Sequence, residues 1–351
     1  MMGSPPAWLP YSDDVEVRWP QEEEHLGLLL ESFTRINRLL LDPGRLAISD
    51  GHAQHHGLLK GELRVLPGLP TPLAQGLFQR EARYPVLLRL SSAPGNLGLG
   101  EGSCIHGLAL KVLGVEGPKV LTREAQARTQ DFLFVNFPAI PEGAADIYLR
   151  QQLKLEAVAG QSEARPSTFL RDTTDTLPFN ASVLGQGQPL THILGDTFYS
   201  LAALRHGDYV AKLGLFPVSD NLAPLKGRTF DAGEEHALRD AVAGFFAHAG
   251  AEYELRAQLC TDLGTMPVED GSVRWPESQS PYQPLARLVL APQASASPAR
   301  QRCLQDTLTF NPWHCLPAHR PLGSLMRVRR KAFEMKAPVH DEPRGLEELP
   351  D

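Results

Sequence analysis

The stretch Gly51–Val65 constrains the fold most. Its three histidines, His52, His55 and His56, directly precede an alternating apolar and polar segment that begins at Gly61. Alternation of this kind is the period of a half-buried β-strand. Imidazoles just before a strand can lie at the mouth of a sheet or barrel, where chemistry is often placed. The sequence therefore predicts a strand with candidate functional side chains at its N-terminal end.

Strand patterns recur eight times, four before a helical interruption and four after it. We expect these strands at residues 61–66, 85–92, 106–114, 130–137, 197–205, 209–218, 252–260 and 285–290. Helical periodicity predicts helices over residues 21–41, 142–160 and 234–248. Because a closed barrel leaves no exposed sheet edge, the expected fold is α+β, a closed antiparallel eight-stranded β-barrel with surrounding helices.

The sequence predicts a single domain between two terminal segments. Residues 1–20 are rich in proline and predict an extended N-terminal arm. Residues 21–336 are expected to form the domain, with the barrel over 61–291 and a closing segment over 303–336. Residues 337–351 are charged and contain proline, which predicts a disordered tail.

Charge and composition disfavour several function classes. The formal net charge of −7 argues against nucleic acid as a partner, and the basic run Arg327–Lys331 is interpreted as a solvated loop or strand end. No apolar run approaches the roughly 18 residues of a membrane span, and the first residues do not resemble a signal peptide. The four cysteines form no C-x-x-C pair, so neither a zinc cluster nor a disulfide framework is indicated. We expect a cytoplasmic protein.

The three histidines taken alone are a weak metal motif. Their spacing would place imidazoles on one face of a helix, but Gly51 and Gly57 flank them and disfavour a helix. A turn through Gly57, with solvated loop histidines, is the simpler interpretation.

Four residues on neighbouring strands form a more specific combination. His52 precedes the first strand, Arg89 and Ser91 share one face of the second, and Asn136 ends the fourth. If the strands pair in order, these side chains converge. A histidine held by a hydroxyl can move a proton between the two oxygens of a peroxide while an amide binds the outer oxygen. Such a site still needs a redox centre, which side chains do not supply.

These residues, in this order, resemble the haem catalase superfamily. His52-Ala-Gln-His-His-Gly is similar to the family's distal His-Ala-Lys segment, and Arg89-Leu-Ser to its Arg-Phe-Ser. His106-Gly-Leu-Ala-Leu-Lys-Val resembles the family's third strand, and Asn136-Phe-Pro its Asn-x-Pro. The likeness runs from about Gly51 to Gly323. Its closing part, Phe-Asn-Pro-Trp-His-Cys through His-Arg-Pro-Leu-Gly, is shared with a small bacterial branch of catalase-like, haem-binding proteins.

The resemblance implies haem b as cofactor and hydrogen peroxide or an organic hydroperoxide as substrate. It implies that His52 is the distal acid and base, that Ser91 orients it, and that Asn136 is the distal amide. It further implies that the haem contacts are Arg89, a propionate partner, together with Phe134 and Arg320. Catalases are commonly tetramers embraced by N-terminal arms, so the resemblance also implies a homo-oligomer.

The chain departs from the family on the proximal side. Catalases bind iron through a tyrosine preceded four residues earlier by an arginine, and this sequence has no tyrosine after Tyr282. Aligning the His-Arg segments puts His314 near the tyrosine position and Phe310 near the arginine position. His314 is then the candidate iron ligand as a neutral imidazole, with a Cys315 thiolate as the alternative. The other alternative is that haem is absent.

Smaller departures predict weak haem binding. Ser49 and His106 stand where the family has arginines, and each missing charge-assisted hydrogen bond is worth about 1.5–3 kcal/mol. The expected function is therefore that of a haem-binding peroxidase-like protein with weak true catalase activity. The alternative is a haem-less barrel that binds a small apolar ligand, and a non-haem metal on the three histidines is the third hypothesis.

Overall fold

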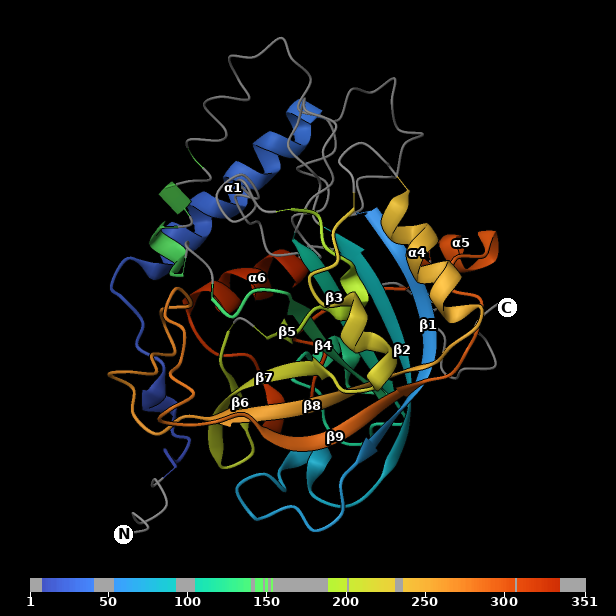
Figure 1. Cartoon of the computed structure of the whole chain (residues 1–351). Helices are drawn as coiled ribbons and strands as arrows, with labels where there is room; N and C mark the ends of the chain where they lie inside the picture. The colour runs from blue at the N-terminus through green and yellow to red at the C-terminus, as the bar shows by residue number, and fades with distance from the viewer. Residues whose placement is uncertain are drawn as a thin grey trace.

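The computed structural model describes residues 8–40, 54–92, 105–139, 143–147, 149–150, 153, 189–200, 202–230, 236–306 and 308–334. The predicted tail over 337–351 lies outside these residues, as does most of the predicted helix over 142–160. The centre of the molecule is a strongly twisted, closed sheet with helices around its upper end (Figure 1).

Nine strands form this sheet in the described part of the chain, and every pairing is antiparallel. They are β1 (Gln54–Val65), β2 (Arg83–Ser92), β3 (His106–Leu113), β4 (Thr129–Val135), β5 (Phe198–Tyr199), β6 (Leu204–His206), β7 (Tyr209–Pro217), β8 (Ala251–Leu259) and β9 (Gln283–Leu290). Their order is β5-β4-β3-β2-β1-β9-β8-β7-β6, and β5 also pairs with β7. Eight strands thus close into a ring, with β6 added beside β7. The predicted eight-stranded antiparallel barrel is confirmed.

The first strand is longer than its sequence predicts. β1 begins at Gln54 and continues through a bulge between His55 and Gly57, so the predicted turn through Gly57 is wrong. Gly57 has another role, because a Cβ there would lie 3.2 Å from Cγ1 of Val242. The glycine lets a helix pack closely on the strand. The strand predicted over 197–205 is instead split into β5 and β6.

Strands β1–β4 are buried on both faces. Leu88 and Leu90 of β2 belong to the large apolar cluster inside the barrel. Leu87, which alternates with them, packs outside the barrel against Leu304 of α5 (Pro298–Asp306). Arg89 follows at the next position on this outer face. The side chains of one strand therefore serve two separate layers.

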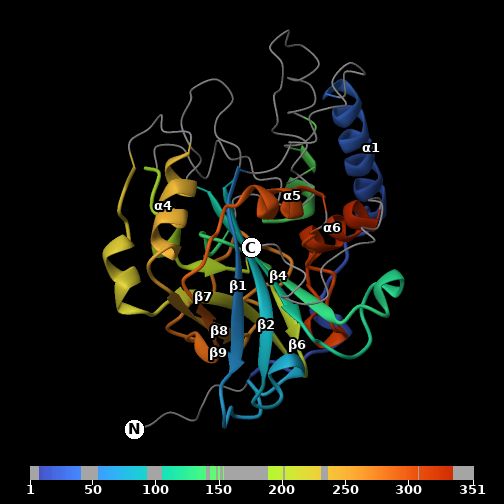
Figure 2. The same ribbon diagram turned by 90° about the vertical axis from the view of Figure 1, so that its right-hand side faces the viewer.

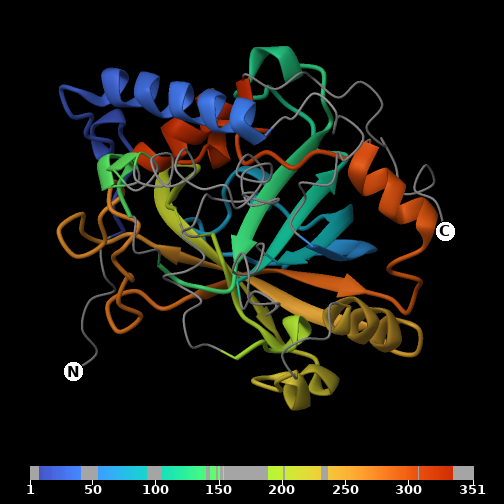
Figure 3. The same ribbon diagram turned by 90° about the horizontal axis from the view of Figure 1, so that it is seen from above.

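Four helices surround the barrel in the described residues. α1 (Glu22–Leu40) lies alongside α6 (Ser324–Glu334), as Figure 3 shows from above. α4 (Ala237–Phe246) adds apolar side chains to the barrel cluster, and α5 covers β1 from outside (Figure 2). Among these residues, no helix is both long and apolar enough to cross a membrane. The basic run Arg327–Lys331 lies in α6, so its interpretation as a solvated loop or strand end is wrong.

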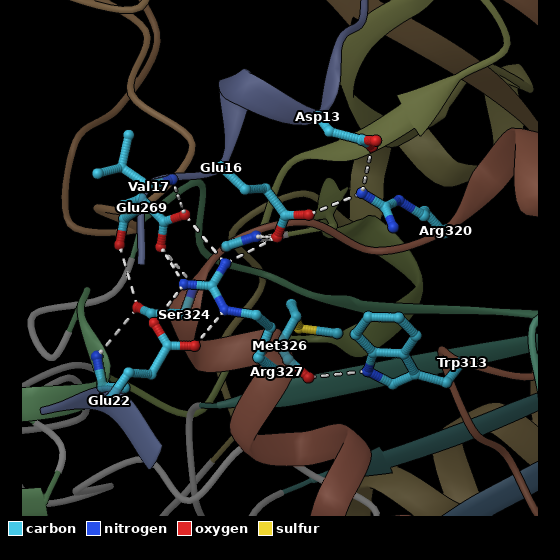
Figure 4. A network of polar contacts seen from close by, with 12 residues as sticks. Asp13, Glu16, Val17, Glu22, Glu269, Trp313, Arg320, Ser324, Met326 and Arg327 are labelled. Atoms are coloured by element: carbon cyan, nitrogen blue, oxygen red, sulfur yellow. Dashed lines mark hydrogen bonds and ion pairs between the residues drawn. The ribbon is translucent and has the colours of Figure 1, made fainter. Parts of the chain in front are cut away.

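Arg327 anchors α6 through a buried ionic network, drawn in Figure 4. Its guanidinium lies 2.7 Å from a carboxylate oxygen of Glu16, 2.5 Å from Glu22 and 3.0 Å from Glu269. Burial alone would lower the pKa of Arg327, but hydrogen bonds to Glu22 and Glu269 outweigh it and raise the pKa. Part of the predicted arm, residues 8–20, is thereby tied to the domain.

Replacing Arg327 by alanine is expected to lower the free energy of unfolding by about 3–5 kcal/mol, because it leaves three carboxylates near one another without their cation. Chemical denaturation measures this change. Arg128→Ala is the matched control, since its ion pair with Glu116 is exposed and such pairs contribute about 0–1 kcal/mol. Equal effects of the two substitutions would show that the Arg327 network does not stabilise the fold.

Several buried histidines make the fold sensitive to acid. Burial lowers the pKa of His206 and of His192 to about 4, and burial, with a smaller effect of His106, lowers that of His56 to about 3. Histidine in an unfolded chain has a pKa of about 6.5. Below that pH the unfolded chain binds protons that the folded chain does not, which favours unfolding.

The free energy of unfolding should therefore fall between about pH 6.5 and pH 4, by up to about 1.4 kcal/mol per pH unit for each such histidine. Denaturation at a series of pH values measures the slope. In His206→Phe, which keeps a ring against Phe78, the slope should be shallower, and in His248→Gln, an exposed site, it should be unchanged. An unaltered slope in His206→Phe would contradict the neutral, buried state of His206.

Candidate functional site

A pocket lies between the outer face of β2–β4 and the closing segment of the chain. Its atom-free space is about 760 Å³ including the open mouth, of which the centre of a water molecule can reach about 70 Å³. The side chains that line it are mostly apolar. The polar and charged ones are Arg89, Ser91, Asp131, Ser200, His319 and Arg329.

Two arginines enter the pocket from different elements. Arg89 comes from β2 and Arg329 from α6, and they are only 5% and 7% exposed. The guanidinium of Arg89 stacks on the Phe310 ring, 4.8 Å from its centroid. The acidic lining residue, Asp131, forms a buried ion pair with Lys111 at 2.9 Å and balances that lysine. The described lining thus includes two arginines and one carboxylate.

One wall of the pocket is made of small residues. Gly107 is opposite Ser91 in the β2–β3 register, and a Cβ at Gly107 would lie 3.0 Å from the Ser91 hydroxyl oxygen. Ala109 follows on the same face, and Ala202 and Ala203 also line the pocket. A flat apolar group can lie against such a wall without meeting long side chains.

The predicted distal residues are only partly gathered here. Ser91 and Phe134 line the pocket together with Arg89, whereas His52 lies outside the described residues. Asn136 follows β4, where its side-chain oxygen accepts a hydrogen bond from the backbone N–H of His106 at 2.9 Å. Its amide nitrogen donates to Asp196 at 3.3 Å.

A polar cluster surrounds this amide at the end of the barrel. Nδ1 of His106 lies 2.5 Å from a carboxylate oxygen of Asp196. Nε2 of His56 lies 2.9 Å from the Ser92 hydroxyl. His56 is buried in β1, so its interpretation as a solvated loop histidine is wrong. No group of three or more metal-binding side chains occurs among the described residues. No pattern in the sequence indicates Asp196, which lies 60 residues after Asn136.

The proximal candidates lie outside the pocket lining. His314 is buried, with Nε2 2.5 Å from the Thr129 hydroxyl and Nδ1 2.5 Å from Glu124. A neutral imidazole with one nitrogen donating and the other accepting has no lone pair left for iron. Burial raises the pKa of the Cys315 thiol, which disfavours a thiolate. Arg320 instead binds Glu16 at 2.9 Å.

The lining residues from α6 and from the segment just before it were not predicted from the sequence. Met326 and Arg329 come from α6, and His319 lies just before it. The backbone N–H of Leu77 donates to Nε2 of His319 at 2.9 Å, and burial lowers the pKa of His319 well below its usual value. Its Nδ1 therefore carries the ring proton. Helical spacing of Met326 and Arg329, three residues apart, is the signal that could have located this face.

No protein-family model and no curated protein matches this sequence. Its structure is similar to several solved structures. A fungal catalase and catalase A of Saccharomyces cerevisiae each have a TM-score of 0.53 and 15% identity over 93% of this chain. A bacterial catalase has a TM-score of 0.50 and 16% identity over 81% of this chain.

This chain is shorter than those catalases. The matches cover 64% of the fungal enzyme, 66% of the yeast enzyme and 55% of the bacterial enzyme, which is less than two thirds of each. At this low identity the likeness concerns the fold, and the closed barrel with its surrounding helices accounts for it. The chain has the fold of the catalases.

Proposed function

We propose that this chain binds haem b in the pocket between β2–β4 and α6, and that it acts on hydrogen peroxide or an organic hydroperoxide. The observation that carries the proposal is the pair of buried arginines, Arg89 and Arg329, which enter one apolar pocket from two elements. The catalase fold supports it, since the catalases that this structure resembles are haem enzymes.

The residues of the pocket fit a porphyrin in two respects. Haem b has a flat apolar ring, which suits the wall of Gly107, Ala109 and Ser91. It also carries two propionates, which suit guanidinium groups because these form strong hydrogen bonds with carboxylates.

In this proposal the chain's own residues bind the propionates of the haem and transfer the proton of the peroxide. Arg89 and Arg329 hold the carboxylates, and the Ser91 hydroxyl orients the imidazole of His52. His52 takes the proton from one peroxide oxygen and delivers it to the other. Asn136, whose amide nitrogen donates to Asp196 in this structure, would hold the outer oxygen by exchanging that hydrogen bond for one to the peroxide. Haem, when bound, supplies the redox chemistry that these side chains lack.

A second candidate function is binding of a small apolar carboxylate, such as a fatty acid, without redox chemistry. The same observation favours it, because arginines in an apolar pocket can form the same charge-assisted hydrogen bonds with the carboxylate of a fatty acid as with a haem propionate. A fatty acid would then compete with haemin for this pocket, or would bind to the pocket although haemin does not.

Titration of the protein with haemin is expected to give a saturable Soret change. Arg89→Gln and Arg329→Gln should each weaken binding about 10- to 100-fold, because each removes a charge-assisted hydrogen bond of about 1.5–3 kcal/mol. Arg287→Gln, at a half-exposed position of β9 where the arginine pairs with Glu254, makes the same charge change outside the pocket and should not alter binding. Arg89→Lys, which keeps the charge, checks that the loss comes from the bidentate contact. No saturable binding by the parent would refute the proposal, and saturable binding of oleate alone would favour the second candidate.

Peroxide consumption by the haem-loaded protein should fall about 10²- to 10⁴-fold in His52→Gln, the usual contribution of a general acid or base. Ser91→Ala should lower the rate less and change its pH profile, because Ser91 acts through His52. His248→Gln, at an exposed position, serves as the control. If His52→Gln reacts as fast as the parent, the proposed proton transfer is wrong.

A further inference from the structure

Lys212 is a deeply buried lysine on the outer face of the barrel. It lies in β7, where its neighbours Ala211 and Leu213 belong to the apolar cluster inside the barrel. Because side chains alternate along a strand, Lys212 points outward. There the ring of Trp275 lies 5.1 Å from its Nζ, and the lysine is only 3% exposed. Lysine is almost never fully buried without a charged partner, so the surroundings of this amine need an explanation.

The amine of Lys212 has few of the partners that a buried cation needs. An ammonium group has three N–H donors, and in the described part of the chain Nζ donates one hydrogen bond, to the backbone oxygen of Val273 at 3.3 Å. Lys212 forms no ion pair with the described residues, whereas the buried Lys111 is paired with Asp131 at 2.9 Å. Burial lowers the pKa of Lys212 to about 8, although the charge of Asp270 acts in the opposite direction.

Lys212 lines a second, smaller pocket between the loop after β8 and the start of α6. The atom-free space of this pocket is about 340 Å³ including the mouth, of which the centre of a water molecule can reach about 10 Å³. Most side chains around it are small or apolar: Ala202, Ala203, Pro267, Val268, Leu322, Leu325 and Met326. The amine therefore faces a narrow apolar space, which suits a small uncharged molecule.

The acidic lining residue of this second pocket is already engaged. The carboxylate of Glu269 binds the guanidinium of Arg327 at 3.0 Å and accepts a hydrogen bond from the backbone N–H of Ser324 at 2.7 Å (Figure 4). It thus neutralises Arg327 and not Lys212. A reaction that turns the ammonium into a neutral group removes a charge that burial makes unfavourable. Condensation with an aldehyde does this, because its product is a neutral imine.

We infer that Lys212 is a nucleophilic lysine that condenses with short-chain aliphatic aldehydes in the pocket beside the start of α6. The lone pair of the neutral amine attacks the carbonyl carbon, and a C–N bond forms. The carbonyl oxygen then leaves as water with the two hydrogens of the amine, so the step consumes no oxidant or reductant. The inference is independent of the proposed function, because Lys212 does not line the first pocket.

The test treats the full-length parent protein with propanal and sodium cyanoborohydride, which reduces an imine to a stable secondary amine. Peptide mass spectrometry then measures the labelling rate of each lysine. At pH 7, Lys212 should be labelled at least about tenfold faster than the exposed Lys226, because exposed lysines in general stay charged up to about pH 10.4. The ratio of the two rates should fall as the pH rises above about 8, where Lys212 is already neutral.

Two controls connect the reactivity of Lys212 to the pocket. In guanidinium chloride, which unfolds the chain, the two lysines should be labelled at the same rate, because the pocket is lost. Lys212→Met keeps an unbranched side chain without the amine and should remove the rapidly labelled site. Lys226→Arg is the matched control and should leave the labelling of Lys212 unchanged.

Measurements on the parent decide the inference even if Lys212→Met does not fold. Labelling of Lys212 at pH 7 that is no faster than that of Lys226 would overturn it, since the amine would then be buried without being reactive. A preference for Lys212 that persists in guanidinium chloride would overturn it as well, because the local sequence and not the pocket would then cause the reactivity.

Discussion

The buried cation of Arg327 is the interaction on which the arrangement of the pocket depends. It is surrounded by Glu16, Glu22 and Glu269, which come from the N-terminal segment, the start of α1 and the loop after β8. A buried charge costs free energy unless it is paired, so these segments must come together wherever the arginine is buried. The hydrogen bond from the Trp313 indole to the backbone oxygen of Met326 holds the same helix from another side. The two lining residues of α6 are thereby fixed opposite the sheet.

The sheet uses its two faces for different purposes. The inner face of β1–β4 fills the barrel with leucine, valine and phenylalanine, which supplies stability by burying apolar area. The outer face carries polar groups that would weaken a simple core, including Arg89, Ser91 and the Lys111–Asp131 pair. Phe310 lies over the cations of both Arg89 and Lys111 and compensates part of their desolvation. Polar groups held at this cost are typical of a binding site, and this is why the pocket is the best candidate for function.

Much of the barrel could be predicted because strand alternation is a local property. The pattern from Val86 to Ser92 reports which side chains share a face, and the closed ring follows from eight such strands. The pattern failed at Gly57, where the helix that packs on the strand decides the local geometry. It failed again over 327–331, because the carboxylates that make Arg327 a buried residue lie up to 311 positions away. Periodicity carries no information about partners at that distance.

The sequence by itself determined most of the strands, the face that Arg89 and Ser91 share, and the likeness to the catalases, because each depends on residues a few positions apart. Tertiary structure alone decided which side chains meet. It placed His314 between Thr129 and Glu124 and paired Arg320 with Glu16 of the N-terminal segment. It also brought Arg329 into the pocket with Arg89. The arrangement of side chains in the site depends on hydrogen bonds and ion pairs between segments distant in the chain. Their pairing is fixed only when the barrel closes and α6 packs against it.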